Sequence, residues 1–304
     1  MCPTSDIPPL DLSRQPDWRR FFPDADHRWR MGLRRGEAAA FFAPGETATE
    51  VLAERAHWLA TDPESYAGLM PAAEPGLRET VQLAREWGAK IEPAQSPWDQ
   101  LLCLGRTWEA DLVWLVADEE GVSRVAGGVV CFPSSWALRE KLGQTLGDTH
   151  RPVPGMNAAL DRPMEVFLDR LVPGEAWLRE NAGYSGSAER NQHPDQPHRA
   201  LTATVSVDEV WIRLEHQLLL KLPVSQALLF GIRVEVVPLR WVRDVPWAAA
   251  RLTRLLRTLS PQAAEYKGLT EARAGLVAQL LEAQSRVADE STSTEANQSS
   301  GEIP

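Results

Sequence analysis

The sequence predicts an α+β protein, in which helices lie over one face of an antiparallel sheet and helical extensions flank that core. Three observations favour this class. Helical periodicity dominates the first third of the chain, two β-rich runs joined by a tight turn come next, and two long strands precede a helical C-terminal part. Helices, hairpin, helices, strand pair and helices therefore follow one another in that order.

The N-terminal part is expected to be helical after an extended, proline-rich leader over residues 1–30. Apolar residues at helical spacing predict helices over residues 46–60 and 76–87. A third, short helix is expected to begin at Ser96 and Pro97, because a capping serine followed by a first-turn proline is typical of a helix start.

The periodicity then changes to that of strands. Residues 112–116 and 125–131 are rich in β-branched and aromatic side chains, and the acidic, glycine-ended segment 118–121 between them indicates a hairpin. A capped short helix ended by glycine is predicted over 134–143. A turn punctuated by prolines, residues 150–155, leads into an amphipathic helix.

The second half begins with a polar, turn-rich stretch over 181–199, which predicts a long surface loop. Two strands are expected over 210–220 and 227–237. Helices are expected over 246–259 and 270–287, where apolar residues again recur at helical spacing.

Residues 31–287 are expected to form a single domain, followed by a disordered acidic tail over 288–304. The formal charge of -10, from 42 acidic and 32 basic residues, argues against nucleic acid or an anionic membrane surface as the partner. No apolar run reaches the roughly 18 residues that span a bilayer, and the N-terminus lacks the character of a signal peptide. The expected location is the cytoplasm, where the three cysteines would stay reduced.

The two late strands carry a polar pattern. Alternation places Arg213, Glu215 and Gln217 on one face of the first strand. If the strands are joined by a turn centred on Val224, the second strand brings Arg233 opposite Glu215.

The same turn would place Glu235 opposite Arg213 and Gly231 opposite Gln217. Two interpretations follow from these pairs. The face is either a solvated surface with two ion pairs or the polar floor of a ligand pocket, with open space above Gly231.

The sequence lacks the common nucleotide-binding and catalytic motifs, and His150 is its main candidate ligand. The chain has no G-x-G-x-x-G after a strand, no phosphate-binding loop, no H-E-x-x-H and no G-x-S-x-G. His150 lies between a glycine-ended helix and a turn stiffened by Pro152 and Pro154, so it is pre-organised. It is a candidate axial metal ligand or a residue that stabilises the turn.

Six motifs, in the same order along the chain, resemble those of a known family. They are Arg30–Leu33, Phe132–Gly143, His150–Gly155, Arg213–Gln217, Leu229–Arg233 and Tyr266–Leu269. In these motifs the chain resembles the haem-dependent oxidative N-demethylase α-subunit family, and together they span residues 30–269.

The resemblance implies a PAS-like fold that binds haem b and oxidises a small methylated amine with O₂, releasing formaldehyde. Electrons would come from NADPH through FMN and an iron–sulfur cluster on a separate reductase subunit, and tetrahydrofolate could accept the formaldehyde. The chain has no nucleotide motif and only three cysteines, fewer than the roughly four that a cluster needs, which agrees with redox centres on partner subunits.

The resemblance also implies site roles. His150 would be the proximal ligand of the iron, and Arg213 and Arg233 would anchor the haem propionates. Glu215, Gln217 and Arg233 would form the catalytic face near the iron.

The chain departs from the family pattern at several positions. Ala182 follows Asn181 where the family has an aromatic residue, His216 replaces an arginine, and Glu235 replaces a tyrosine. These departures, with a divergent loop over 183–199, leave the identity of the amine open. A haem-binding PAS-like sensor without turnover, or an interaction protein, is the alternative.

Overall fold

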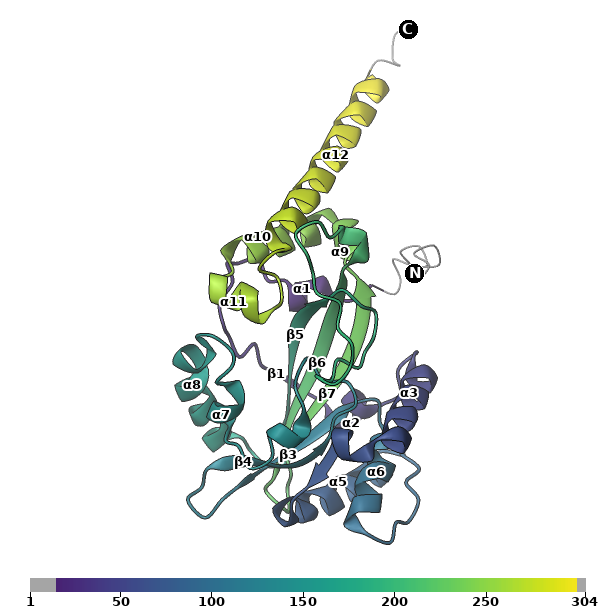
Figure 1. Ribbon diagram of the computed structural model, residues 1–304, viewed down its shortest axis with the longest axis vertical. Helices are drawn as coiled ribbons and strands as arrows, with labels where there is room; N and C mark the ends of the chain where they lie inside the picture. The colour runs from purple at the N-terminus through teal and green to yellow at the C-terminus, as the bar shows by residue number, and fades with distance from the viewer. Residues whose placement is uncertain (1–14, 300–304) are drawn as a thin grey trace.

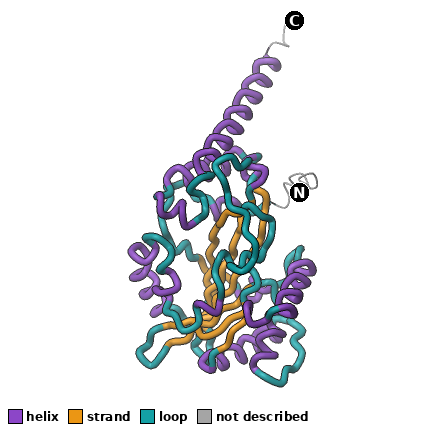
Figure 2. Tube along the Cα trace, viewed as in Figure 1, coloured by secondary structure: helices purple, strands orange, loops and turns teal. Residues whose placement is uncertain are grey.

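The computed structural model describes residues 15–299, so parts of the expected leader and tail, residues 1–14 and 300–304, lie outside the described residues. The centre of the fold is an antiparallel sheet of seven strands in the order β1-β5-β6-β7-β3-β4-β2 (Figures 1 and 2). The strands are β1 Arg34–Gly36, β2 Ala67–Leu69, β3 Asp111–Ala117, β4 Ser123–Val129, β5 Ala176–Ser185, β6 Trp211–Lys221 and β7 Leu228–Pro238. The predicted α+β class is confirmed.

Helices pack around the sheet, and further helices lie at both ends of the described chain. They are α1 Trp18–Phe21, α2 Ala38–Phe42, α3 Ala48–Thr61, α4 Pro63–Tyr66, α5 Glu74–Glu86, α6 Pro97–Thr107, α7 Leu146–His150, α8 Met156–Arg170, α9 Arg240–Arg243, α10 Pro246–Thr258, α11 Pro261–Tyr266 and α12 Arg273–Ser299. Among the described residues, 3₁₀ turns lie at Pro71–Ala73, Leu138–Glu140 and Val207–Glu209. The predicted helices α3, α5 and α6 are confirmed, and Ser96 caps α6 by accepting from the backbone N–H of Asp99. In the described part of the chain, no helix is both long and apolar enough to cross a bilayer.

β3 explains how the layers are arranged. Its Leu112 and Trp114 pack into the core with α3, α5 and α6, whereas Val113 and Leu115 face the other side. Figure 1 shows α7 and α8 beyond that second face and α9 to α12 at the far end of the long strands. A strand buried on both faces is apolar throughout, which is why its sequence runs without polar alternation.

The register of the β6–β7 hairpin differs from the predicted register by one residue. Its loop has four residues, Pro223 to Gln226, closed by a Leu222 N–H to Ala227 O bond of 2.8 Å, so the turn centre lies between Val224 and Ser225. Gln226 adopts φ +61°, and the Glu79 carboxylate accepts from the N–H groups of Val224 and Ser225, both at 2.7 Å. A one-residue slip moves every side chain of the partner strand to the opposite face.

The predicted pairs between the two strands are therefore wrong. Glu215 lies opposite Val234, and Arg233 lies opposite His216. Gly231 leaves no space above the polar face, because it lies on the other face against the Phe41 and Phe42 rings. A Cβ added to Gly231 would lie 3.0 Å from Phe41 Cε1.

Further local predictions differ from the structure. The first part of the loop expected over 181–199 belongs to β5, which pairs with β6 along its whole length. The helix expected over 134–143 is reduced to the 3₁₀ turn Leu138–Glu140, because Ser135 adopts φ +61° and its N–H donates to Gln192 O at 3.0 Å. At the C-terminal end α12 extends through Ser299, so the predicted tail begins inside a helix.

Candidate functional site

A cavity of about 770 Å³ lies between the sheet and the α7–α8 segment. Its size falls within the roughly 300–1,000 Å³ that is usual for small-molecule and cofactor sites. Much of the wall is apolar, with Val113, Leu160, Phe167, Leu219 and Phe230 among its residues. Trp29, Met31 and Leu33 from the N-terminal segment and the end of α11 complete the enclosure.

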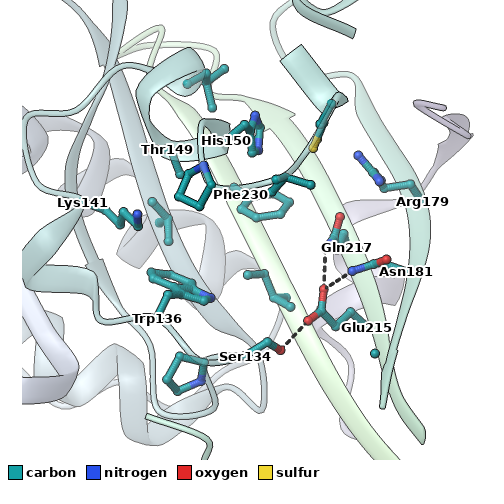
Figure 3. A pocket seen from close by; sticks show the side chains of 18 of the residues that line it. Ser134, Trp136, Lys141, Thr149, His150, Arg179, Asn181, Glu215, Gln217 and Phe230 are labelled. Atoms are coloured by element: carbon teal, nitrogen blue, oxygen red, sulfur yellow. Dashed lines mark hydrogen bonds between the residues drawn. The ribbon is translucent and has the colours of Figure 1, made fainter. Parts of the chain in front are cut away.

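His150 ends α7 and lies in the wall of the cavity (Figure 3). Its position is fixed by the following turn, where the Val153 N–H donates to His150 O at 2.9 Å and Gly155 adopts φ +72°. Trp29 ties this turn to the N-terminal segment, because its Nε1 donates to Pro154 O at 2.8 Å.

The imidazole of His150 has no hydrogen-bond partner among the described residues, and its Nδ1 is buried. Burial lowers the pKa of His150, Arg179 and Lys141 lower it further, and Asp161 opposes them. The ring is therefore neutral at neutral pH, the form in which an imidazole binds a metal. The ligand role of His150 itself stays a prediction.

Glu215 is the centre of a polar network on the sheet side of the cavity. Ser134 Oγ donates to its Oε1 at 2.7 Å, and Asn181 Nδ2 and Gln217 Nε2 donate to its Oε2 at 3.0 and 2.8 Å. The three donors come from the segment after β4, from β5 and from β6, and Figure 3 shows them converging on the carboxylate. The structure thus brings Glu215 and Gln217 together in the cavity wall, as predicted for the face.

Arg213 lies on the same face, but its hydrogen bonds go to the protein's own backbone and to Ser134. It is 1% exposed, and its guanidinium donates to the carbonyls of Phe132, Pro133, Glu189 and Arg190 at 2.8–3.4 Å. Its Nε and Nη2 also lie 3.4 Å from Ser134 Oγ. Each guanidinium nitrogen already has a partner, so Arg213 clamps two chain segments rather than offering a free group to the cavity.

Arg233 lies outside the cavity, which corrects its predicted place beside Glu215. Its Nη2 is 2.8 Å from Glu109 Oε1, and its Nη1 donates to Phe41 O and Ala43 O, both at 3.0 Å. The register of β7 is the reason, because it turns Arg233 toward α2 and away from the polar face.

A buried ion pair supports the segment that carries Ser134. Arg55 Nη1 lies 2.5 Å from Asp111 Oδ1, and the same carboxylate accepts from the N–H groups of Cys131 and Phe132 at 2.7 and 3.0 Å. Asp111 therefore holds the amide groups of this segment while Arg213 holds its carbonyls. Ser134 is presented to Glu215 by a backbone fixed from both sides.

Arg179 and Lys267 are cationic residues of the cavity wall for which the sequence predicted no role. Arg179 lies on β5 opposite Gln217, and Lys267 follows α11 with its Nζ 2.9 Å from Ala182 O. Burial lowers the pKa of both groups, and Glu215 opposes that effect. The alternation of β5 contains the signal for Arg179, but only once that stretch is assigned to a strand. Within residues 15–299, no group of three or more His, Cys, Asp or Glu side chains is arranged to hold a metal ion.

A largely apolar cavity enclosed by a sheet and a helix pair, with a free imidazole and a fixed carboxylate in its wall, is the kind of site at which proteins bind a small molecule or cofactor. The chain matches the family model described as haem-dependent oxidative N-demethylase, alpha subunit-like, over residues 63–277. It belongs to this family, which confirms the resemblance seen in the motifs. The matched residues include the strands and helices of the cavity, and a family of alpha subunits implies further subunits.

Proposed function

We propose that this chain is the haem-bearing subunit of an O₂-dependent oxidative N-demethylase that acts on a small methylated amine. The observation that carries the proposal is one cavity with two unlike groups in its wall: the unpartnered imidazole of His150 and the carboxylate of Glu215. Family membership supports the same activity.

The residues of the cavity fit a haem. His150 would bind the iron, since a haem needs only one protein ligand and this imidazole lies in the cavity wall without a hydrogen-bond partner among the described residues. Leu219 and Phe230 belong to the apolar wall that would contact the porphyrin. When bound, the haem would supply the activation of O₂.

The chain's own polar residues would bind and orient the amine. Glu215 would pair with the cationic nitrogen, and Ser134, Asn181 and Gln217 would hold the carboxylate in one orientation. Arg213 would not contact the amine, but it would position Ser134, which holds Glu215.

Overall, the methylated amine, O₂, NADPH and a proton would give the demethylated amine, formaldehyde, NADP⁺ and water. A methyl C–H bond becomes C–OH, and the C–N bond then breaks with its electron pair and a proton going to nitrogen. NADPH would deliver its electrons through FMN and an iron–sulfur cluster on a separate reductase subunit. Tetrahydrofolate could take up the formaldehyde, on this chain or on a partner.

Haem reconstitution of the purified full chain tests the proposal. The wild-type protein should acquire a Soret band, His150→Ala should lose or shift it, and His57→Ala, a change at an exposed histidine of α3, should not. With a reductase, dimethylamine or a related amine should then drive NADPH oxidation and release formaldehyde. A red protein inert toward methylated amines would favour the sensor alternative, and a protein that stays colourless after haem supplementation would contradict the proposal.

A further inference from the structure

The cavity wall contains two arginines among the described residues, Arg179 and Arg213. The nitrogens of Arg213 are engaged by carbonyls and by Ser134, as described above. Arg179 is different, because its guanidinium makes no hydrogen bond or ion pair with any described residue, and its Nε is buried without a partner. Figure 3 shows the side chain extending from β5 toward the interior.

The carboxylates nearest to Arg179 are bound by other groups. Glu180 leaves the opposite face of β5, where Arg34 forms an ion pair with it and Arg20 lies 3.8 Å away. Glu215 accepts its hydrogen bonds from Ser134, Asn181 and Gln217. Both carboxylates act on Arg179 only through space, and they only partly offset the lowering of its pKa by burial.

A guanidinium stays protonated in proteins, so Arg179 remains a cation although it is half-buried and its Nε is fully buried. A partly buried charge without a protein partner is costly to the fold, and native structures usually compensate it by another group. We propose that Arg179 binds a carboxylate group of the ligand that fills this cavity. The planar guanidinium can donate two parallel hydrogen bonds to such a group.

The identity of the ligand rests on the proposed function, which offers two sources of a carboxylate. One is a propionate of the haem, for which Arg179 would replace Arg213 and Arg233. The other is the carboxylate of an N-methylated amino acid whose ammonium group contacts Glu215. Arg179 and Glu215 are diagonal neighbours on one face of β5 and β6, a relation that separates two residues by roughly 7–8 Å. A cation and an anion at that spacing suit a small zwitterion.

Equilibrium titrations of the full chain separate the two sources. If a propionate is bound, Arg179→Gln should weaken haem affinity by at least about tenfold, Arg179→Lys should restore part of it, and the variant should bind haem dimethyl ester like the wild type. If the substrate carboxylate is bound, haem affinity should stay unchanged. The affinity for N-methylglycine, measured by calorimetry with and without haem, should then fall at least about tenfold while that for dimethylamine does not. Arg35→Gln is the matched control, because Arg35 is an exposed arginine of neighbouring β1.

The unfolding of the ligand-free protein gives a second readout that needs no haem. Arg179→Met should raise the urea midpoint, because it removes a cation that has no protein partner and keeps an unbranched apolar side chain, whereas Arg35→Met should not. A lower midpoint would show a structural role and overturn the proposal. So would unchanged affinity of Arg179→Gln for both haem and N-methylglycine, or failure of the wild type to bind either. Absence of haem binding alone would refute the proposed function but leave the N-methylglycine and urea measurements decisive for Arg179.

Discussion

Asn181 and Glu215 lie directly opposite each other on β5 and β6, and the side-chain amide of Asn181 donates to Glu215 Oε2 at 3.0 Å. This pair joins the strand that was recognised from sequence to the strand that was not. It fixes the carboxylate of Glu215 at the wall of the cavity, where a cationic group of a ligand can reach it.

Glu215→Gln tests that role. The substitution keeps the shape of the side chain and removes the charge, so the affinity for dimethylammonium should fall by at least about tenfold. Calorimetric titration of the haem-loaded protein measures the change. Glu175→Gln is the control, because Glu175 pairs with the exposed Arg35. Equal affinities in Glu215→Gln and the wild type would exclude Glu215 as the amine-binding group.

Arg213→Lys should destabilise the fold. A lysine cannot reach the carbonyls of both the 132–133 and 189–190 segments, and each buried polar group left unsatisfied costs about 1–3 kcal/mol. We expect a loss of about 3 kcal/mol in the free energy of unfolding by urea. Arg199→Lys, at an exposed arginine that pairs with Glu209, should cost less than about 1 kcal/mol. A stability near that of the wild type would show that Arg213 does not clamp these segments.

Cys131 should be unreactive in the folded protein. It is fully buried, and burial raises the pKa of its thiol to about 12, so almost no thiolate forms under mildly alkaline conditions. Iodoacetamide labelling followed by peptide mapping should find Cys131 unmodified in the native protein and modified after unfolding. The partly exposed Cys103 serves as the internal comparison. Labelling of Cys131 at the rate of Cys103 would contradict the burial of the segment that precedes Ser134.

Acid should destabilise the protein in part through His193. Burial lowers the pKa of this 1% exposed residue, while Asp195 opposes the shift. The folded state thus binds the proton less readily than the unfolded chain, and stability falls as pH drops below about 6.5, the ordinary histidine value.

His193→Asn should make that acid dependence shallower, because its amide oxygen can replace Nδ1 as the acceptor for the Asp195 N–H. Urea midpoints measured across the acidic range, with His57→Asn as the exposed control, give the comparison. If His193→Asn leaves the slope unchanged, the buried imidazole does not account for acid sensitivity.

Much of the site could be located from sequence because its residues lie in continuous patterns. Alternation along β6 placed Glu215 and Gln217 on one face, and the proline-flanked turn identified His150 as a fixed side chain at the cavity. Arg179 was missed, because residues 176–180 belong to no predicted element and the rest of β5 was predicted as a loop; the strand is recognised only when β6 is seen to pair with it.

The one-residue error in β7 had the largest consequence for the site. Periodicity assigns the two faces of a strand, but it does not say which face of the neighbour they match. That match was decided by the four-residue loop with Gln226 at positive φ and by the Glu79 carboxylate, which is far away in sequence. Arg233 consequently pairs with Glu109 rather than with Glu215.

The sequence by itself determined the α+β class, the principal helices and strands, and the family, because these depend on local periodicity, capping and ordered motifs. Only the tertiary structure decided which charged groups face the cavity and which form hydrogen bonds with the protein's own backbone. That outcome depends on the register between strands and on contacts between distant segments, such as those of Arg213 with residues 132–133 and 189–190. No local pattern encodes such contacts, since their partners meet only after the chain has folded.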